Sequence, residues 1–212
     1  MNFGDMVTEV GILVDDDELT EEMIGGYINQ ALLDVAGQVF LPSLKRVTTV
    51  TTSLTNSYVS LAALTGGFGG RLVKVINADG TSLGVVASLE VLVETYGLLT
   101  TAGSVETVCL EGNVLWYAYL PAVAETLTVL YYSNPAELFS DDDTPSDIPE
   151  FCHRQLLVNG AAALAFADFE DGLDGEKVNT MSHLGLQENG FKKLREWLGR
   201  NRLHCISSMW SN

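Results

Sequence analysis

Positive charge is scarce in this 212-residue sequence. It contains 11 lysine and arginine residues against 28 aspartate and glutamate residues, which gives a formal net charge of −17 at pH 7. No lysine or arginine occurs between Lys74 and Arg154. A surface this negative repels phosphate groups, so the composition excludes a broad nucleic-acid-binding footprint.

Cysteine is also rare, and long apolar runs are missing. Cys109, Cys152 and Cys205 form no CxxC pair, and their odd number favours buried or incidental thiols in a reducing compartment. No run of about 18 residues is apolar throughout, so we expect no membrane span. The acidic start of the chain lacks the basic residues of a signal peptide. We therefore expect a soluble protein made in a cytoplasm.

Motifs for catalysis and metal binding are missing as well. The three histidines, His153, His183 and His204, stand in no HxxxH or HxxE arrangement. The adjacent pairs Cys152-His153 and His204-Cys205 would form a zinc site only if folding brought them together. The sequence contains no GxSxG nucleophile motif, and the glycine-rich stretch 66–70 lacks the lysine of a phosphate-binding loop. We therefore predict no catalytic residue, no metal ligand and no cofactor, and expect the protein not to be an enzyme.

Two aspartate triplets, 15–17 and 141–143, are the strongest candidates for a cation site. Their carboxylates are suitable ligands for calcium, but a calcium loop alternates its ligands and turns at a glycine. Three consecutive aspartates do not match that spacing. We interpret the first triplet as the end of a helix and the second as a linker that leads into one.

Helical patterns occupy both ends of the chain. Apolar residues recur at helical spacing from Phe3 to Val14, and Thr20 is a suitable N-cap for an amphipathic helix that Pro42 ends. Gly25 and Gly26 each cost that helix about 1 kcal/mol relative to alanine. Near the other end, residues 151–169 are apolar nearly all round, with alanines that allow close helix packing. A last helix is predicted over 176–200; its expected apolar positions are Met181, Leu184, Phe191, Leu194, Trp197 and Leu198.

The middle of the chain, from Lys45 to Tyr132, shows strand patterns. Val- and Thr-rich segments alternate with turn signals, including Asp79-Gly80 and Gly112-Asn113, and the second of these joins the clearest predicted hairpin. Residues 66–70 are predicted to form a loop between strands. Ser88 is a suitable cap for a short helix over 88–96. Leu127, Val129 and Tyr131 alternate with threonines, which predicts one buried strand face.

Three aromatic residues on one predicted strand leave two alternatives open. Strand alternation places Trp116 on the face opposite Tyr117 and Tyr119. One alternative is a carbohydrate-binding platform. The other is a strand that is buried on both faces, and this is the commoner reason for such a pattern.

Together these patterns predict an α+β fold, in which N- and C-terminal helices form a bundle and an antiparallel β domain is inserted between them. The expected boundaries are 1–44 for the N-terminal helices, 45–140 for the β domain, 141–202 for the C-terminal helices and 203–212 for an extended tail.

The few cations are concentrated near the C-terminus. Five of the eleven lie there, and an aromatic residue follows them in the tail; the residues are Lys192, Lys193, Arg195, Arg200, Arg202 and Trp210. The basic group is either a docking surface for an acidic partner or a solvated helix face.

Four short motifs, in order, resemble the head-to-tail adaptor family of tailed bacteriophages. The first is Glu22-Met23-Ile24-Gly25-Gly26-Tyr27-Ile28-Asn29-Gln30-Ala31, in which an acidic residue precedes Tyr-Ile-Asn and Ala. The second is the Glu111-Gly112-Asn113 turn before an aromatic strand that ends at Pro121. The third is Tyr131-Tyr132-Ser133-Asn134-Pro135, and the fourth is Ile148-Pro149-Glu150 at the start of an alanine-rich helix. The resemblance covers about residues 3–200.

The resemblance implies a structural virion protein of the neck, between the capsid portal and the tail. It implies a homo-oligomeric ring of twelve copies that binds the portal protein and offers a surface to the tail or neck protein below. Genomic DNA would pass through the channel without specific binding, and acidic walls favour its sliding. We expect the basic helix and the tail with Trp210 to dock on the portal. The alternative from another class is a virion module that binds carbohydrate or a cell surface through the aromatic β region.

Overall fold

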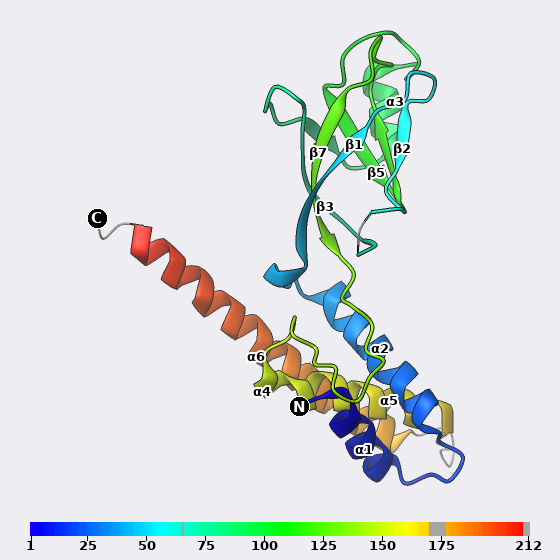
Figure 1. The fold of residues 1–212 in the computed structure, drawn as a ribbon, viewed down its shortest axis with the longest axis vertical. Helices are drawn as coiled ribbons and strands as arrows, with labels where there is room; N and C mark the ends of the chain where they lie inside the picture. The colour runs from blue at the N-terminus through cyan, green and yellow to red at the C-terminus, as the bar shows by residue number, and fades with distance from the viewer. Residues whose placement is uncertain (65, 170–176, 210–212) are drawn as a thin grey trace. The chain divides into compact units, whose positions relative to one another are not determined.

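The protein has a mixed α+β fold with two compact units (Figure 1). The computed structural model describes residues 1–64, 66–169 and 177–209, with the backbone alone over 201–209. One unit comprises Met1–Leu41 and Pro135–Asn212, and we call it the helical unit. The other comprises Pro42–Asn134, and we call it the β unit. The β unit ends at Asn134 rather than at the expected residue 140.

The helical unit contains helices from both ends of the sequence. They are α1 (Phe3–Val14), α2 (Glu21–Gln38), α4 (Glu150–His153), η2 (Arg154–Val158), α5 (Asn159–Phe169) and α6 (Val178–Met209). The Thr20 hydroxyl accepts a hydrogen bond from the Met23 N–H, which confirms the predicted N-cap of α2. Segment η2 is π-helical and joins α4 to α5, so the predicted helix over 151–169 is present with one local change of winding.

Small residues let the helices of this unit pack closely. Helix α5 contacts both α2 and α6, and its alanines 161–163 are buried. A Cβ on Gly160 would lie against the Gln187 side chain and 3.0 Å from the Ala31 Cβ. A Cβ on Gly190 would lie 2.9 Å from Leu156 Cδ2. The expected close approach around the alanine-rich helix is therefore confirmed.

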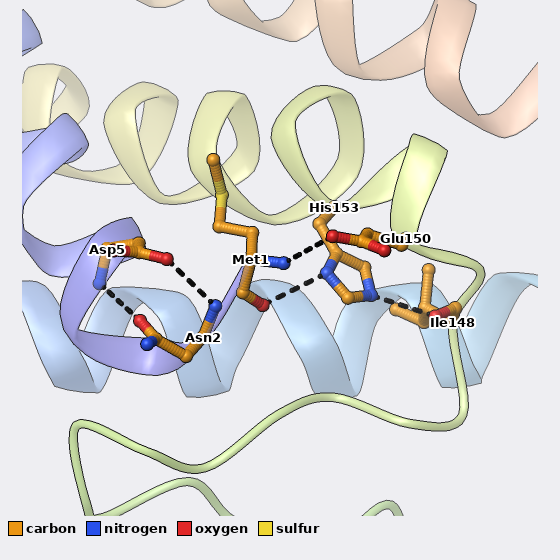
Figure 2. A network of polar contacts seen from close by, with 6 residues as sticks. All are labelled: Met1, Asn2, Asp5, Ile148, Glu150 and His153. Carbon is orange, nitrogen blue, oxygen red and sulfur yellow. Dashed lines mark hydrogen bonds and ion pairs between the residues drawn. The ribbon is translucent and has the colours of Figure 1, made fainter.

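A polar network joins the start of α1 to the start of α4 (Figure 2). The His153 imidazole is buried, with Nε2 2.8 Å from the Ile148 carbonyl oxygen and Nδ1 3.3 Å from the Met1 carbonyl oxygen. The Met1 ammonium group lies 3.0 Å from Glu150 Oε1. This hydrogen bond and the ammonium charge lower the pKa of the Glu150 carboxyl group. The network fixes both segments by contacts between residues about 150 positions apart.

The Asn2 side chain closes the first turn of α1 in the same view. Asn2 Oδ1 accepts a hydrogen bond from the Asp5 N–H at 2.8 Å, and the Asp5 carboxylate accepts one from the Asn2 N–H at 3.3 Å. This reciprocal capping box satisfies two backbone donors that a helix start leaves unpaired. It explains why a helix begins at Phe3.

The Tyr-Ile-Asn segment of α2 has a separate contact for each side chain. The Tyr27 hydroxyl donates a hydrogen bond to Asp168 Oδ2 at 2.6 Å. Burial and this hydrogen bond raise the pKa of Tyr27 to about 12. Ile28 is fully buried, and Asn29 binds the backbone of Leu138. The three residues thus tie α2 to α5, to the core and to the segment before α4.

In its described residues, the β unit holds two sheets, a short α-helix and a 3-10 helix. Its elements are η1 (Pro42–Leu44), β1 (Lys45–Thr51), β2 (Tyr58–Ser60), β3 (Phe68–Ile76), β4 (Gly84–Val86), α3 (Leu89–Tyr96), β5 (Thr107–Glu111), β6 (Val114–Tyr117) and β7 (Thr126–Ser133). The strand orders are β1-β7-β3 and β2-β6-β5-β4. The predicted Ser88 cap of α3 is confirmed, since its hydroxyl accepts from the Val91 N–H. The predicted hairpin is β5–β6.

Two details of the β unit differ from the expectations. The sheets are not wholly antiparallel, because β4 pairs with β5 in parallel. The connection between these strands contains α3 and is long enough to act as the crossover that a parallel pair requires. Residues 66–70 are also not all loop. Strand β3 begins at Phe68, and a Cβ on Gly69 would lie 2.8 Å from the Tyr132 carbonyl oxygen, so glycine permits this close pairing.

The core of the β unit lies between its sheets. Leu127, Val129 and Tyr131 of β7 are buried in one cluster with Val75 and Tyr117. The predicted burial of alternate β7 residues is therefore confirmed.

Helix α6 is longer than predicted. It continues without interruption through Gly185 and Gly190 and reaches Met209, so the backbone of 203–209 is helical and not extended. No proline or glycine occurs between Arg200 and Met209, and nothing in the sequence stops the helix there. The remainder of the expected tail, 210–212, lies outside the described residues.

Both aspartate triplets have local structural roles. Asp15 ends α1 in a left-handed conformation, and Asp16 Oδ1 accepts from the Glu18 N–H at 2.8 Å. Asp143 Oδ2 accepts from the backbone N–H groups of Ser140 and Phe139, and these two bonds lower the pKa of the carboxyl group. In the described part of the chain, no group of three or more His, Cys, Asp or Glu residues is placed to hold a metal ion.

Cys109 and Cys152 are buried free thiols, as predicted, and burial raises the pKa of each. A raised pKa leaves less reactive thiolate at neutral pH. The side chain of Cys205 lies outside the described residues. Across those residues, none of the helices combines the length and the apolar character that a bilayer span requires.

Candidate docking surface on helix α6

The predicted basic residues lie on the second half of α6. Lys192, Lys193, Arg195 and Arg200 all have exposed side chains. Of the other two predicted residues, Arg202 is described by its backbone alone and Trp210 lies outside the described residues. The candidate surface therefore consists of four cations and the side chains around them.

The buried stripe of α6 explains why these cations are exposed. Gln187, Phe191 and Leu194 are buried against the rest of the helical unit, and residues one or two positions away fall outside the stripe. Three of the expected apolar positions are nevertheless exposed: Met181 at 68%, Leu184 at 44% and Trp197 at 37%. Burial in α6 follows its contacts with α5 and η2, and these select a stripe that includes the polar Gln187.

An aromatic pair lies beside two of the cations. Phe151 of α4 and Trp197 of α6 pack edge to face, with ring centroids 6.3 Å apart at an angle of 65°. Both rings are partly exposed. Together with Lys193, Glu196 and Arg200 they line a groove of about 160 Å³, which we call the aromatic groove.

Arg195 points to a different groove. Its guanidinium carbon lies 5.5 Å from the centroid of the Phe191 ring, a distance that permits a cation–π interaction. The groove has a volume of about 240 Å³ and is lined by Gln38, Val39, Phe40, Arg195, Leu198 and Gly199. The cations therefore form two neighbouring sets: Lys193 and Arg200 in one groove, and Arg195 in the other. Lys192 lines neither groove.

Arg200 is weakly engaged within the chain. Arg200 Nη2 lies 3.8 Å from Glu196 Oε2, and both side chains are largely exposed. Exposed pairs of this kind contribute little to stability and exchange readily with other partners. Trp and Arg side chains are enriched at the energetic centres of protein interfaces. This part of α6 therefore combines exposed cations with a partly exposed aromatic pair, the residue types that such centres use.

Sequence reasoning missed Phe151 and counted Trp197 only among the apolar positions of the last helix. Lys193, Trp197 and Arg200 are spaced at i, i+4 and i+7, which places them on one helix face. An aromatic residue that shares a helix face with two cations was the signal in the sequence that could have indicated this groove. The partner ring, Phe151, lies 46 positions away and is brought alongside only by the packing of α4 on α6.

The aromatic residues of the β unit fall into two clusters. Tyr117 is fully buried, and its cluster differs from that of Trp116, as alternation predicts. Tyr119 shares a cluster with Trp116, which contradicts the expected facing. The reason is that β6 ends at Tyr117 and Tyr119 has a φ of 69°, so the alternation stops. Trp116 packs against the Tyr58 ring with centroids 4.9 Å apart.

A two-unit α+β chain that exposes basic and aromatic side chains together on one helix has surface features typical of proteins that bind other proteins. A comparison with protein families identifies it more closely. Residues 1–205 match the family described as SU10 adaptor protein, and the chain belongs to this family of phage head-to-tail adaptors. A search of curated proteins found no match.

Membership implies a structural protein of the virion neck that associates with portal and tail proteins. A structural adaptor family also points to a protein that is not an enzyme.

Proposed function

We propose that the chain binds the portal ring through the basic half of α6, extends the DNA channel below it and provides the attachment surface for a tail or neck protein. The observation that carries this proposal is the aromatic groove, in which Lys193, Arg200 and the Phe151–Trp197 pair lie together. In a chain of net charge −17 this is a local exception, and it favours an acidic partner surface.

The architecture that fits this role is a helical bundle with the β domain inserted between its two halves. The helical unit would carry the portal contact. The adaptors would form a homo-oligomeric ring, of twelve copies by family resemblance, closed by repetition of one heterologous contact. Genomic DNA would pass through without specific binding, because acidic walls do not retain phosphate groups.

The aromatic groove gives a direct test with a matched control. Trp197→Ala removes the ring that packs on Phe151, whereas Met181→Ala removes a more exposed apolar side chain from the same helix. We expect Trp197→Ala to weaken binding to the assembled portal ring at least tenfold, and Met181→Ala to leave it unchanged. Fluorescence anisotropy of the labelled chain, titrated with portal ring, measures both affinities.

A charge-reversal variant provides a second test of portal binding. Lys193→Glu combined with Arg200→Glu removes both cations of the groove, and we expect portal binding to fall further and to lose much of its dependence on salt. Wild-type affinity in both the Trp197→Ala and the charge-reversed chain would contradict this docking surface.

A further inference from the structure

The helical unit carries a second and larger groove, of about 500 Å³, which has the opposite charge. Its lining residues come from α1, the first half of α2 and the segment before α4, and they include Glu21, Glu22, Gly26, Glu137, Phe139 and Asp141. Four of them are acidic and none is basic. We call this the acidic groove, and residues 137–143 the strap.

The strap is held in place by backbone and side-chain hydrogen bonds. Asn29 exchanges two hydrogen bonds with the backbone of Leu138. Asp143 Oδ2 accepts from the Phe139 and Ser140 N–H groups, each at 2.8 Å. Two N–H groups of α1 donate to strap carbonyl oxygens, from Phe3 to Asp143 at 2.8 Å and from Gly4 to Asp141 at 3.1 Å. The wall of the groove is therefore preorganised.

Phe139 lies on this fixed wall with 77% of its surface exposed. Its backbone N–H is bound by Asp143, so the exposure of the ring is set by an ordered turn. The ring adds exposed apolar surface to the edge of the groove.

Gly26 keeps the groove open. A glycine inside a helix costs about 1 kcal/mol relative to alanine, and a Cβ on Gly26 would meet no atom within 4 Å. Packing within the chain therefore does not require glycine at this position. Gly25 differs, since a Cβ there would lie 3.0 Å from Phe3 Cζ. A side chain on Gly26 would instead occupy the acidic groove.

The β unit presents a surface of complementary character. On the sheet β1-β7-β3, one cross-strand row consists of Lys45, Tyr132 and Arg71, and the next consists of Val47, Leu130 and Lys74. Residues in register across strands project from the same face. Lys45, Arg71 and Lys74 are exposed, and so is Val47, at 66%. We call this set the basic sheet face.

Charge is divided unequally between the units. Of the 28 acidic residues, 6 lie in 42–134, which leaves 22 in the helical unit. All four cations of the β unit belong to β1 and β3, and three of them form the basic sheet face. Each surface also has an apolar part, with Phe139 on one and Val47 and the partly buried Leu130 on the other.

We propose that the acidic groove of one copy receives the basic sheet face of a second copy. Opposite charges around apolar centres give both register and affinity. Because each chain carries both halves, the contact is heterologous and repeats from copy to copy. The inference rests on the proposed assembly of this adaptor into rings and names the surfaces that join its subunits.

Sedimentation velocity of the full chain over a range of concentrations tests the contact. We expect wild type to associate beyond a dimer at low salt and to dissociate at high salt. Gly26→Gln fills the groove, and Lys45→Ala with Lys74→Ala weakens the face, so each variant should remain monomeric. Gly37→Gln, an open position in the same helix, and Thr100→Asp with Asn113→Asp, an equal charge change on exposed turns, should associate like wild type.

Mixing the two defective variants gives the sharpest outcome. The groove variant retains its basic face and the face variant retains its groove, so one interface forms per pair and the mixture should stop at a heterodimer. A wild-type chain that stays monomeric at every concentration would overturn the proposal, and so would a Gly26→Gln chain that associates like wild type.

Portal binding can be scored separately from self-association. The Trp197→Ala chain should still associate with itself, whereas Gly26→Gln should still bind the portal ring. Loss of one property without the other therefore identifies which of the two proposals fails.

Discussion

The side chain of Asn29 and the backbone of Leu138 exchange two hydrogen bonds. Nδ2 donates to the Leu138 carbonyl oxygen at 3.0 Å, and the Leu138 N–H donates to Oδ1 at 2.9 Å. The amide thus satisfies a backbone donor and acceptor in the manner of a strand partner. One helix residue thereby fixes the segment that leads from the β unit into α4.

Removal of that amide should destabilise the helical unit. Asn29→Ala leaves the N–H and carbonyl of Leu138 without partners, and we expect a loss of about 1–3 kcal/mol in the free energy of unfolding. Urea denaturation measures the loss, and hydrogen exchange at the Leu138 amide locates it. Gln30→Ala, which removes only an exposed contact with Asp34, should change stability by less than about 0.5 kcal/mol. Equal effects of the two variants would contradict this role of the Asn29 amide.

Two glycines of α6 should respond to alanine in opposite directions. A Cβ on Gly190 would lie 2.9 Å from Leu156 Cδ2 and 3.0 Å from Gln155 Cβ, so Gly190→Ala should destabilise by about 1–3 kcal/mol through overpacking. A Cβ on Gly185 would meet nothing within 4 Å. Gly185→Ala should therefore stabilise by up to about 1 kcal/mol through helix propensity. Thermal unfolding of both variants gives the comparison; a shift of the same sign in both would show that the packing is wrongly described.

The Tyr117 hydroxyl should matter for the stability of the β unit. It accepts from the Ser53 N–H at 2.8 Å and donates to the Asn56 carbonyl oxygen at 2.7 Å, in a residue that is fully buried. Tyr117→Phe removes these bonds and should cost about 1–2 kcal/mol. The matched change at the exposed Tyr58 should cost less than about 0.5 kcal/mol. Denaturation monitored by β-sheet circular dichroism reports both, and an unchanged Tyr117→Phe chain would contradict the assignment.

Protonation of His183 should lower the stability of the protein at mildly acidic pH. Burial lowers the pKa of this imidazole, whose Nδ1 lies 2.9 Å from Asn159 Oδ1 and whose ring stacks on Phe166. The unfolded chain therefore binds the proton more tightly than the folded chain. Stability is fully present above the ordinary histidine pKa and falls as pH drops from that value towards the folded pKa.

The measurement compares wild type with His183→Gln by urea denaturation between about pH 7.5 and about pH 5. We expect the free energy of unfolding to decrease in both chains as the pH is lowered. The decrease should be less steep in the variant. Identical slopes would show that the imidazole does not contribute to the pH dependence.

Local signals predicted the individual elements well. The Thr20 and Ser88 caps, the alternation in β7 and the Gly112-Asn113 turn each depend on neighbouring residues, and each is present as expected. These features are set by backbone geometry and short-range hydrogen bonds, which a sequence pattern expresses directly.

Features set by tertiary contacts could not be predicted in the same way. The parallel pairing of β4 with β5 depends on how α3 redirects the chain, and no residue pattern specifies it. Trp197 was predicted only as an apolar position of the last helix, because apolar spacing cannot tell a buried stripe from an exposed aromatic pair. The acidic groove combines residues from three segments, and its glycine was visible in the sequence only as a cost to helix propensity.

Imaging by electron microscopy of the purified chain mixed with the portal ring from the same genome tests the adaptor role most directly. The proposed function predicts a symmetric collar of added density on the portal, with α6 and its aromatic groove at the contact, and loss of the collar with the Lys193→Glu and Arg200→Glu chain. A portal ring that remains bare at saturating concentration of the wild-type chain would contradict the proposed function.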